Sequence, residues 1–543
     1  MKILNKKLFI VGLGLATASL SISCSDFLDE TNRESLSIDA ARKNAETFDQ
    51  LLAYVYEVSR NNTTRYASDM LYVLEDLGTD IITRASPVTG TDALNDYVDL
   101  NASNYALQVY WGNQYANISA VNTLLDNAES IEGVDENTLN TGVAEAKFFR
   151  AWAYFNLVEN FGDIPLVLTQ ATEAKTDYTR APQEEVYVQI VADLEDALAG
   201  VDDQPSEYGR VSKDAVRHLL SKVLLTRGYK TFAVSGDFER AADLAETVLA
   251  NHPLASSFES LVDIDNQRNQ EVIFSYLFGS ETSSIGWGNT KHMLYKFEYF
   301  NYPGLARGTL YQNGIGRMPT PFFFDMFEDD DERDDATLRY VLYADQASSD
   351  GQIQIGDTAM YFPKTAWSQS DIDAKPYVVI NPEKYLINDG VTNTHYPMFK
   401  KFDNPGAPFV YADQPALGTR DMVMMRGGEA CLIAAEAYLG MGNNDQAATL
   451  LTTLRGRAGI QTPVAASDVN IDFILDERAR ELIGEVNRWM DLKRTGKLVE
   501  RTLAHNPHAA LNQALSSKHL LRPIPQYEVD ASGGSIEQNE DYK

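Results

Sequence analysis

The chain has 543 residues, of which 44% are hydrophobic and 10% are aromatic, and it carries 78 acidic side chains against 46 basic ones. This composition supports a large packed core and excludes global disorder. The formal charge of −32 makes the phosphate backbone of a nucleic acid a poor partner.

The first 24 residues have the layout of an export signal. Lys2, Lys6 and Lys7 precede an apolar run over residues 8–20, and Ser21-Ile22-Ser23-Cys24 follows. The run is too short to cross a membrane, which takes about 20 apolar residues. Cysteine at the break is similar to a bacterial lipobox. This resemblance implies that residues 1–23 are removed and that Cys24 is lipidated.

Residues 24–34 are polar and acidic, and we interpret them as a tether. No second apolar run approaches the length of a membrane span, so we expect a water-soluble body held by its lipid. If Cys24 is lipidated, Cys431 has no disulfide partner within the chain. Cys431 lies in an apolar helical stretch and is predicted to be a small core residue.

Helical periodicity dominates the residues after the tether. Residues 144–157 place several aromatic side chains on a broad apolar surface, and the run 162–165 then ends this helix. Another helix is predicted to begin at Pro182. Trp111, Trp152 and Trp489 fall within helical patterns, so we predict that they belong to the core.

Two segments about 200 residues apart resemble each other. Residues 229–249 read as a helix, a turn at Gly236-Asp237 and a second helix, and residues 437–454 repeat this order around Gly442-Asn443. Small residues on the second helix allow close packing. This pattern predicts tetratricopeptide-like helix hairpins, although not a regular tandem array.

The region between the hairpins differs in composition. Residues 279–321 and 351–415 are rich in Gly, Pro, Asn, Asp and aromatic residues, with weak periodicity, so we predict a loop-rich insert over 279–415. Short strands are predicted near 272–276 and 377–380. The predicted fold class is therefore all-α dominated, a helix-hairpin superhelix with a loop-rich ligand-binding region and little β-structure.

Motifs along nearly the whole mature chain are similar to those of the SusD/RagB family of outer-membrane nutrient-binding lipoproteins. The order of the motifs carries the resemblance more than any single one. In sequence they are Cys24-Ser25-Asp26-Phe27-Leu28-Asp29, Trp111 with Tyr115 and Asn122, residues 144–152, Phe161-Gly162-Asp163-Ile164-Pro165, Leu454-Arg455-Gly456-Arg457, Glu477-Arg478 with Arg480-Glu481-Leu482, Arg488-Trp489-Met490-Asp491-Leu492, Pro523-Ile524-Pro525 and Gln538-Asn539-Glu540-Asp541-Tyr542. Val486 departs from the pattern, because Gly is common there.

The resemblance implies a lipid-anchored protein of the outer membrane, exposed at the cell surface. Such proteins capture an oligosaccharide and pass it to a TonB-dependent, SusC-like barrel, and they are not enzymes. The family pattern divides the chain into an N-terminal helical region, 35–260, and a C-terminal region, 261–543. A peptide-binding member of the family is the first alternative.

A surface glycoside hydrolase is the second alternative, because it needs two carboxylates in a cleft. Glu477, Glu481 and Glu485 recur every four residues and share one helix face. Arg478, Arg480 and Arg488 lie in the same segment. We therefore interpret the three glutamates as members of ion pairs and predict no catalytic residue.

No cofactor is predicted, and the sequence leaves calcium open. The acidic run 329–335 has Arg333 at its fifth position and lacks the glycine of an EF-hand loop, so we interpret it as a solvated turn. His505 and His508 flank Pro507 and are interpreted as surface residues. Neither pattern predicts a metal site.

Aromatic residues in loops are the remaining signal for a ligand. The face of a sugar ring stacks on Trp or Tyr, while Asp and Arg bind hydroxyl groups. The candidate ligand-binding residues are Asp80, Arg84, Tyr97, Trp287, Tyr295, Tyr299, Tyr311 and Trp367. Which glycan they contact, or whether they contact a peptide, stays open at the level of the sequence.

Overall fold

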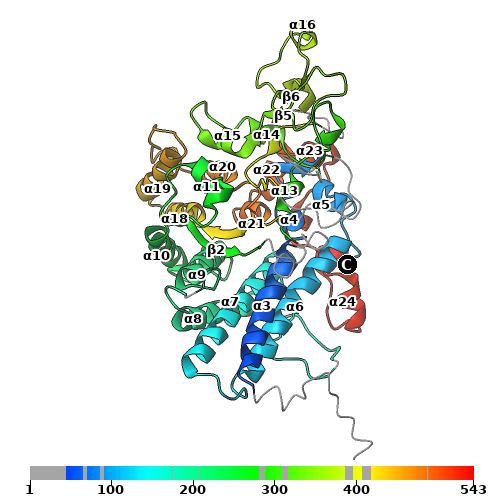
Figure 1. Cartoon of the computed structure of the whole chain (residues 1–543). Helices are drawn as coiled ribbons and strands as arrows, with labels where there is room; N and C mark the ends of the chain where they lie inside the picture. The colour runs from blue at the N-terminus through cyan, green and yellow to red at the C-terminus, as the bar shows by residue number, and fades with distance from the viewer. Residues whose placement is uncertain are drawn as a thin grey trace, which may run out of the picture.

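The computed structural model describes residues 44–64, 70–85, 91–173, 175–205, 207–279, 288–307, 316–385, 395–406, 418–485 and 487–543. Helices dominate, and a smaller lobe with short strands projects from one end of the helical body (Figure 1). One large hydrophobic core fills the body, and a second one lies within the lobe. The predicted helix-dominated fold class is confirmed.

The N-terminal part of the chain, up to residue 251, contributes the long helices at the bottom of the body in Figure 1. Its elements are α3 (Glu46–Thr64), α4 (Met70–Glu75), β1 (Ile82–Arg84), α5 (Asp92–Asp96), α6 (Tyr105–Ala128), α7 (Glu136–Phe161), α8 (Gln183–Gly200), α9 (Lys213–Gly228) and α10 (Asp237–Asn251). Buried residues occur all around the second half of α7, because α3, α6, α8 and α9 pack on it. α7 is therefore the central helix of this part.

Side chains fix where these helices begin. Asn104 accepts hydrogen bonds from the amides of Ala106 and Leu107 at the start of α6, and Asp135 accepts one from Thr138 at the start of α7. α7 ends at Gly162, whose φ of +78° suits glycine. The predicted break after residue 161 therefore has a backbone cause.

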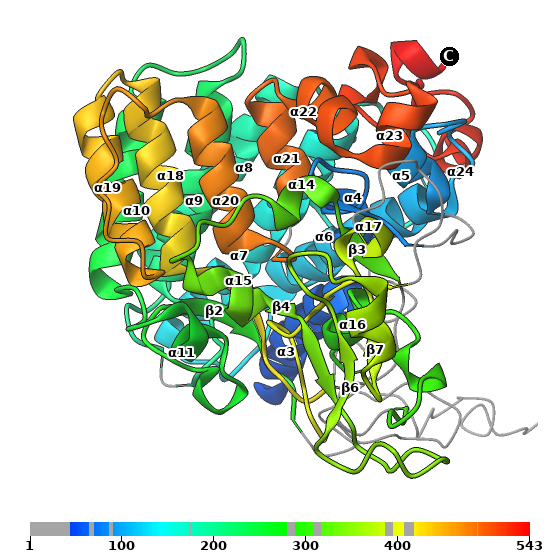
Figure 2. The ribbon, with the colours of Figure 1, turned by 90° about the horizontal axis from the view of Figure 1, so that it is seen from above.

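The two predicted hairpins are α9–α10 and α18 (Gly427–Gly440) with α19 (Asn444–Arg457). In the first hairpin, α9 already ends at Gly228, so the helix predicted from Tyr229 is wrong and residues 229–236 form the turn. α10 packs on both α9 and α18, which places the hairpins side by side (Figure 2). Ala241, Ala245 and Ala434 are fully buried at these contacts, because small side chains let helices approach closely.

The middle of the chain supplies most of the strands. After α11 (Phe258–Val262) and η2 (Ile264–Asn266) come β2 (Val272–Tyr276), α13 (Lys291–Leu294), η3 (Tyr299–Asn301), β3 (Arg317–Pro319), α14 (Pro321–Phe324), α15 (Glu332–Thr337), β4 (Leu338–Arg339), β5 (Val341–Tyr343), β6 (Thr358–Tyr361), α16 (Gln369–Asp373), β7 (Val378–Val379), α17 (Pro382–Tyr385), β8 (Met398–Phe399) and β9 (Met422–Arg426). β2 pairs with β9 and β4 with β8, both antiparallel. Both predicted strands occur, as β2 and β7.

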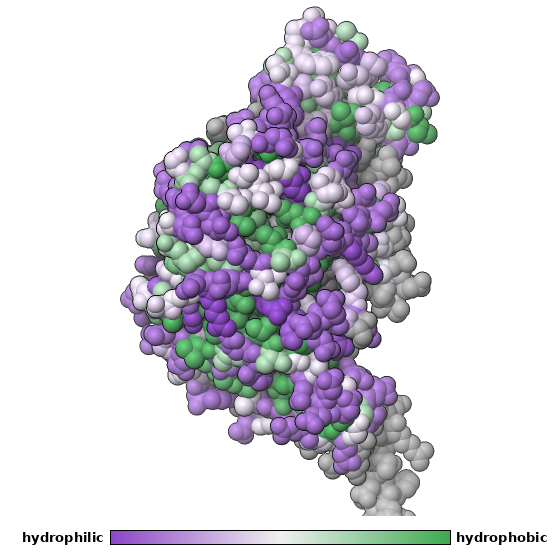
Figure 3. Space-filling model, turned by 90° about the vertical axis from the view of Figure 1, so that its left-hand side faces the viewer, coloured by the Kyte–Doolittle hydropathy of each residue, from purple (hydrophilic) through white to green (hydrophobic). Residues whose placement is uncertain are grey.

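The lobe contains a sheet in the order β5-β6-β7, with β5 and β6 antiparallel and β6 and β7 parallel. Leu342, Met360 and Phe362 are fully buried under this sheet. A waist separates the lobe from the body in the space-filling view, and hydrophobic side chains gather in the middle of the body on that face (Figure 3). The predicted loop-rich insert therefore packs around its own core.

The remainder of the chain returns to the body. Its elements are α20 (Ile471–Leu482), α21 (Arg488–Arg494), α22 (Leu498–His505), α23 (Pro507–Asn512), η4 (Ser517–Leu520), α24 (Gln526–Ala531) and η5 (Glu540–Tyr542). Trp111 and Trp489 are buried, as predicted, while Trp152 is half-buried and stacks parallel to Tyr276. Cys431 is also buried, which confirms its predicted place in the core.

The last segment holds earlier helices together. Arg522 donates to the side chain of Asn160 at the end of α7 and to the carbonyl of Leu74 in α4. Asn539 donates to the carbonyl of Phe161 at 2.9 Å. The end of the chain is thus part of the N-terminal helical packing.

Candidate functional site

Strands β1 and β3 bring the early polar loop to the base of the lobe. They pair antiparallel, with Arg84 opposite Arg317. Ala85, the residue after β1, is buried in the core of the lobe together with Met318. Candidate ligand-binding residues were predicted in both the early loop and the aromatic insert, and this ladder joins the two segments.

Arg84 is a half-buried cation at this junction. Its guanidinium donates to both carboxylate oxygens of Asp96, at 3.1 and 2.9 Å, and lies 3.9 Å from Asp92. Burial acts to lower the pKa of Arg84, but Asp96 outweighs it and raises the pKa above the ordinary value. Arg84 therefore stays charged, and the Asp92 side chain beside it is partly exposed.

Asp80 is a correction to the predicted ligand-binding set. Its side chain is fully buried and pairs with Arg488 and Arg501, with nitrogen–oxygen distances of 2.6 and 2.9 Å. Burial alone would raise the pKa of Asp80, but the two guanidinium groups lower it. The carboxylate is enclosed by its cationic partners and presents no surface to a ligand.

Three predicted aromatic residues are also corrections, because their rings are buried. Tyr97 donates to the carbonyl of Gly78 at 2.7 Å. Tyr295 donates to Asp76 at 2.5 Å and stacks on Phe399 with ring centroids 4.4 Å apart. Tyr299 is fully buried in the core of the lobe. A sugar needs a free ring face, which these residues lack.

Trp367 lies at the outer end of the lobe, directly before α16, and is half-buried. Its backbone exchanges two hydrogen bonds with the side chain of Asn381, at 3.0 and 2.9 Å. The ring lies 5.3 Å from that of Tyr361, and the Lys375 ammonium lies 5.4 Å from the indole centroid. Among the predicted residues that the structure describes, Trp367 and Arg84 keep some exposed surface.

Tyr343 is an exposed aromatic residue of the lobe that the sequence analysis missed. Half of its surface is accessible, whereas its neighbour Leu342 is buried. The alternation of inward-facing and outward-facing residues along β5 could have predicted that Tyr343 is exposed. We refer to Tyr343, Tyr361, Trp367 and Lys375 as the lobe surface.

Some predicted residues lie outside the described part of the chain. They are Cys24, Trp287, Tyr311 and Val486. Their assigned roles stay predictions.

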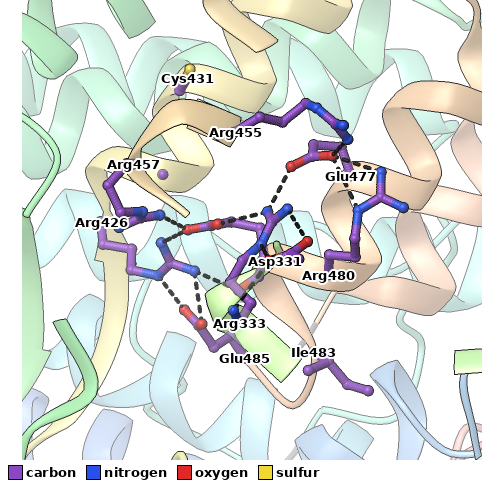
Figure 4. A network of polar contacts seen from close by, with 12 residues as sticks. Asp331, Arg333, Arg426, Cys431, Arg455, Arg457, Glu477, Arg480, Ile483 and Glu485 are labelled. Carbon is purple, nitrogen blue, oxygen red and sulfur yellow. Dashed lines mark hydrogen bonds and ion pairs between the residues drawn. The ribbon is translucent and has the colours of Figure 1, made fainter. Parts of the chain in front are cut away.

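Of the three glutamates considered for hydrolysis, Glu477 and Glu481 are fully buried and Glu485 is partly buried, and all three pair with a network of guanidinium groups (Figure 4). Glu477 accepts from Arg333 at 2.6 Å and from Arg480 at 2.7 Å. Glu485 accepts two hydrogen bonds from Arg426, at 2.7 and 2.9 Å. The predicted ion pairs are confirmed, although most partners come from distant segments.

The electrostatics of this network oppose acid–base catalysis. Burial alone would raise the pKa of Glu477 and of Glu485, but the neighbouring guanidinium groups lower both to about 2. Glu481, which pairs with Arg426 and Arg457, has its pKa lowered further for the same reason. A general acid needs a pKa close to the working pH, so these carboxylates are structural.

The acidic run 329–335 is a further correction, because it is not simply a solvated turn. Asp331 caps α15 and binds Arg333 through nitrogen–oxygen contacts of 2.8 and 2.7 Å, and Arg333 is fully buried. His508, interpreted as exposed, is also buried and contacts Thr83 at 2.8 Å. In the described ranges, no three His, Cys, Asp or Glu side chains are grouped so that they could hold a metal ion.

No helix in the part of the chain that the structure covers combines the length and apolar character required to span a bilayer. The hairpin array, the projecting lobe and its aromatic surface define a class of helix-hairpin proteins that carry a loop-built lobe. The profile of the SusD family matches residues 270–542, and a profile described as starch-binding, associating with the outer membrane, matches residues 26–225. The chain therefore belongs to the SusD family.

Individual relatives agree with this assignment. SusD-like protein P2 of Formosa agariphila is 26% identical over 461 residues, which cover 81% of each chain. A laminarin binding SusD-like protein superposes with a TM-score of 0.71 at 23% identity, over 92% of this chain and 100% of that one. The surface glycan-binding protein A of Bacteroides uniformis gives a TM-score of 0.68 at 19% identity, over 92% and 100%. The two structures establish the shared fold.

Proposed function

We propose that this protein captures oligosaccharides at the cell surface and delivers them to a TonB-dependent, SusC-like barrel without breaking bonds itself. The observation that carries the proposal is the half-buried Trp367, whose backbone is held by Asn381 and whose indole lies beside Tyr361 and Lys375. Membership of the SusD family supports it, as do the ligands in the names of the two structural relatives.

The lobe surface provides the two kinds of contact that a sugar requires. Tyr343 and Trp367 offer apolar ring surface to the C–H face of a sugar, and Lys375 offers hydrogen-bond donors to its hydroxyl groups. Affinity for a flexible oligosaccharide should be modest, because ordering its linkages costs entropy. Modest affinity also suits a protein that must release its cargo.

Calorimetry with the chain starting after Cys24 tests capture. The panel contains laminarin oligosaccharides, maltooligosaccharides and short peptides. We expect binding to one of the glycans and a loss of about tenfold or more in affinity in Trp367→Ala, because the substitution removes the apolar ring surface on which the C–H face of a sugar would pack. Tyr54→Ala is the matched control, because Tyr54 is 53% exposed on α3, away from the lobe.

The result also separates the alternatives. Binding of peptides alone would support the peptide-binding alternative. Shortened glycan products made by the purified protein would contradict a role in capture only. A glycan that binds equally to wild type and Trp367→Ala would remove the lobe surface from the proposal.

The anchor is tested separately. We expect Cys24 to carry lipid, residues 1–23 to be removed, and the protein to be exposed on the outer membrane. Metabolic labelling with an alkyne fatty acid should mark the wild type and not Cys24→Ser. An unmodified first residue in mass spectrometry of the native protein would contradict lipidation.

A further inference from the structure

A hollow lies away from the lobe, between α6, the segment 165–178 and the C-terminal segment. It has a volume of about 250 Å³ and adjoins a polar hollow of about 350 Å³ within residues 166–179. Trp111, Gly112, Tyr115, Tyr178, Glu528 and Ile536 are among the residues that line it. We refer to the 250 Å³ space as the α6 groove.

One wall of the α6 groove is fixed by side chains of α6 and α7. Tyr115 donates to the carbonyl of Pro165 at 2.8 Å, and Asn122 donates to that of Val167 at 2.9 Å. Tyr154 contacts the backbone of Val167 through both its carbonyl and its amide, at 2.6 and 2.7 Å. These contacts hold an extended segment against the helices and fix this wall of the groove.

The opposite wall comes from the end of the chain. Ser535 donates to the carbonyl of Tyr178 at 2.8 Å, which joins the C-terminal segment to the loop. Ile536 is buried next to Ser535, and Glu528 projects from α24. Segments more than 350 residues apart therefore meet around one space.

Glu528 is the charged group of the groove. In the ranges that the structure covers, its carboxylate has neither a hydrogen-bond partner nor an ion-pair partner, and burial raises its pKa. A partly desolvated carboxylate is stabilised by a cationic donor. The remaining lining is mainly apolar and includes the aromatic residues Trp111, Tyr115 and Tyr178.

We propose that the α6 groove binds an organic cation with an apolar body, such as an aralkyl ammonium, whose charged group pairs with Glu528. Aromatic rings attract cations, and an apolar body removes the remaining groove surface from water. The formal charge of −32 also raises the local concentration of cations. This inference concerns a place remote from the lobe surface and does not depend on glycan capture.

Benzylamine and benzyl alcohol are matched probes, because they share the apolar body and differ in charge. With the mature chain starting after Cys24, ligand-observed NMR should show benzylamine binding at least about tenfold more tightly than benzyl alcohol, a ratio typical of one charge-assisted hydrogen bond. Glu528→Gln should bring benzylamine to the level of benzyl alcohol. Equal binding of both probes to the wild type, or binding of neither, would overturn the proposal.

Gly112 allows the groove to be filled without disturbing the fold. It lies within α6, and a Cβ atom there would meet no atom within 4 Å. Gly112→Leu should abolish benzylamine binding while keeping the circular dichroism spectrum and the glycan affinity. Gly456→Leu, at an equally open position in α19, is the control and should bind normally. Benzylamine binding that persists in Gly112→Leu would assign the cation to another surface.

Discussion

Arg333 Nη1 donates to Glu477 Oε1 at 2.6 Å, across 144 positions of the chain. Arg333 also binds Asp331 and Glu481, so one buried guanidinium joins the acidic run before α15 to helix α20. This contact connects the strand-rich middle of the chain to its terminal helices.

Removal of this guanidinium should strongly destabilise the fold. Arg333→Met leaves three buried carboxylates with a missing partner, for which we expect a loss of about 3–5 kcal/mol. Denaturant unfolding followed by circular dichroism measures it. Arg240→Met is the control, because Arg240 is 47% exposed and its pair with Glu195 contributes about 1 kcal/mol or less. Similar midpoints for the two variants would contradict a structural role for the network.

The network should also make stability depend on acid. Glu477 and Glu485 have ordinary pKa values of 4.5 that fall to about 2 in the folded protein, because guanidinium attraction outweighs burial. Lowered carboxylate pKa values stabilise the folded state above the unfolded pKa, and this contribution disappears as the pH falls through the folded pKa.

We therefore expect the free energy of unfolding to decrease between about pH 5 and pH 2, by roughly 3 kcal/mol for each of these carboxylates. Unfolding curves at a series of pH values measure this. Glu485→Gln should lower stability at neutral pH and make the decrease shallower. An unchanged slope in that variant would show that other carboxylates control acid unfolding.

Gly427, at the start of α18, should not tolerate a side chain. A Cβ atom there would lie 2.4 Å from the carbonyl oxygen of His252, which is backbone and cannot rotate away. Gly427→Ala is therefore expected to lower the melting temperature by several degrees, for a cost of about 1–3 kcal/mol. Gly456→Ala, where the Cβ meets open space within α19, should be neutral or raise stability by up to about 1 kcal/mol. A lower melting temperature for Gly456→Ala than for Gly427→Ala would contradict the close approach of α18 to the backbone of His252.

Cys431 should be unreactive in the folded protein. Burial raises the pKa of its thiol well above the ordinary value, and the side chain has no exposed surface. In the chain starting after Cys24, a thiol reagent should modify Cys431 only at the rate of unfolding. Rapid modification at neutral pH without denaturant would show that α18 opens locally.

The sequence predicted local structure better than it predicted contacts. The hairpin around Gly442 and the strand at 272–276 follow from turn residues and β-branched side chains, which act locally. Nothing local shows that α10 packs on α18, because that contact joins residues about 200 positions apart. The period-four spacing correctly indicated that Glu477 and Glu481 share a face of α20, but Glu485 lies beyond the end of this helix at Leu482, so the predicted face does not extend to it. The spacing could not show that Arg333 and Arg426 reach that face from elsewhere.

The candidate site was harder to predict, because the burial of a loop side chain also depends on contacts with distant segments. A loop aromatic residue can cover a small core or face a ligand, and composition does not distinguish the two. Tyr295 and Tyr299 pack inside, because the insert must bury apolar surface of its own. Trp367 keeps some exposure near the outer end of the lobe, where fewer segments cover it. Only the alternation of buried and exposed residues along the strand around Tyr343 could have predicted an outward-facing aromatic side chain.

The contacts of Arg522 and Asn539 with the ends of α4 and α7 constrain the order in which parts of the chain can fold. The residues they join are separated by 362 to 448 positions, so α4 and α7 make these contacts only after the segment that contains residues 522 and 539 has packed on them. Until then, α4 and α7 lack the hydrogen bonds that Arg522 and Asn539 donate to them. A purified chain that starts after Cys24 and ends at residue 519 should therefore remain sensitive to protease in this region.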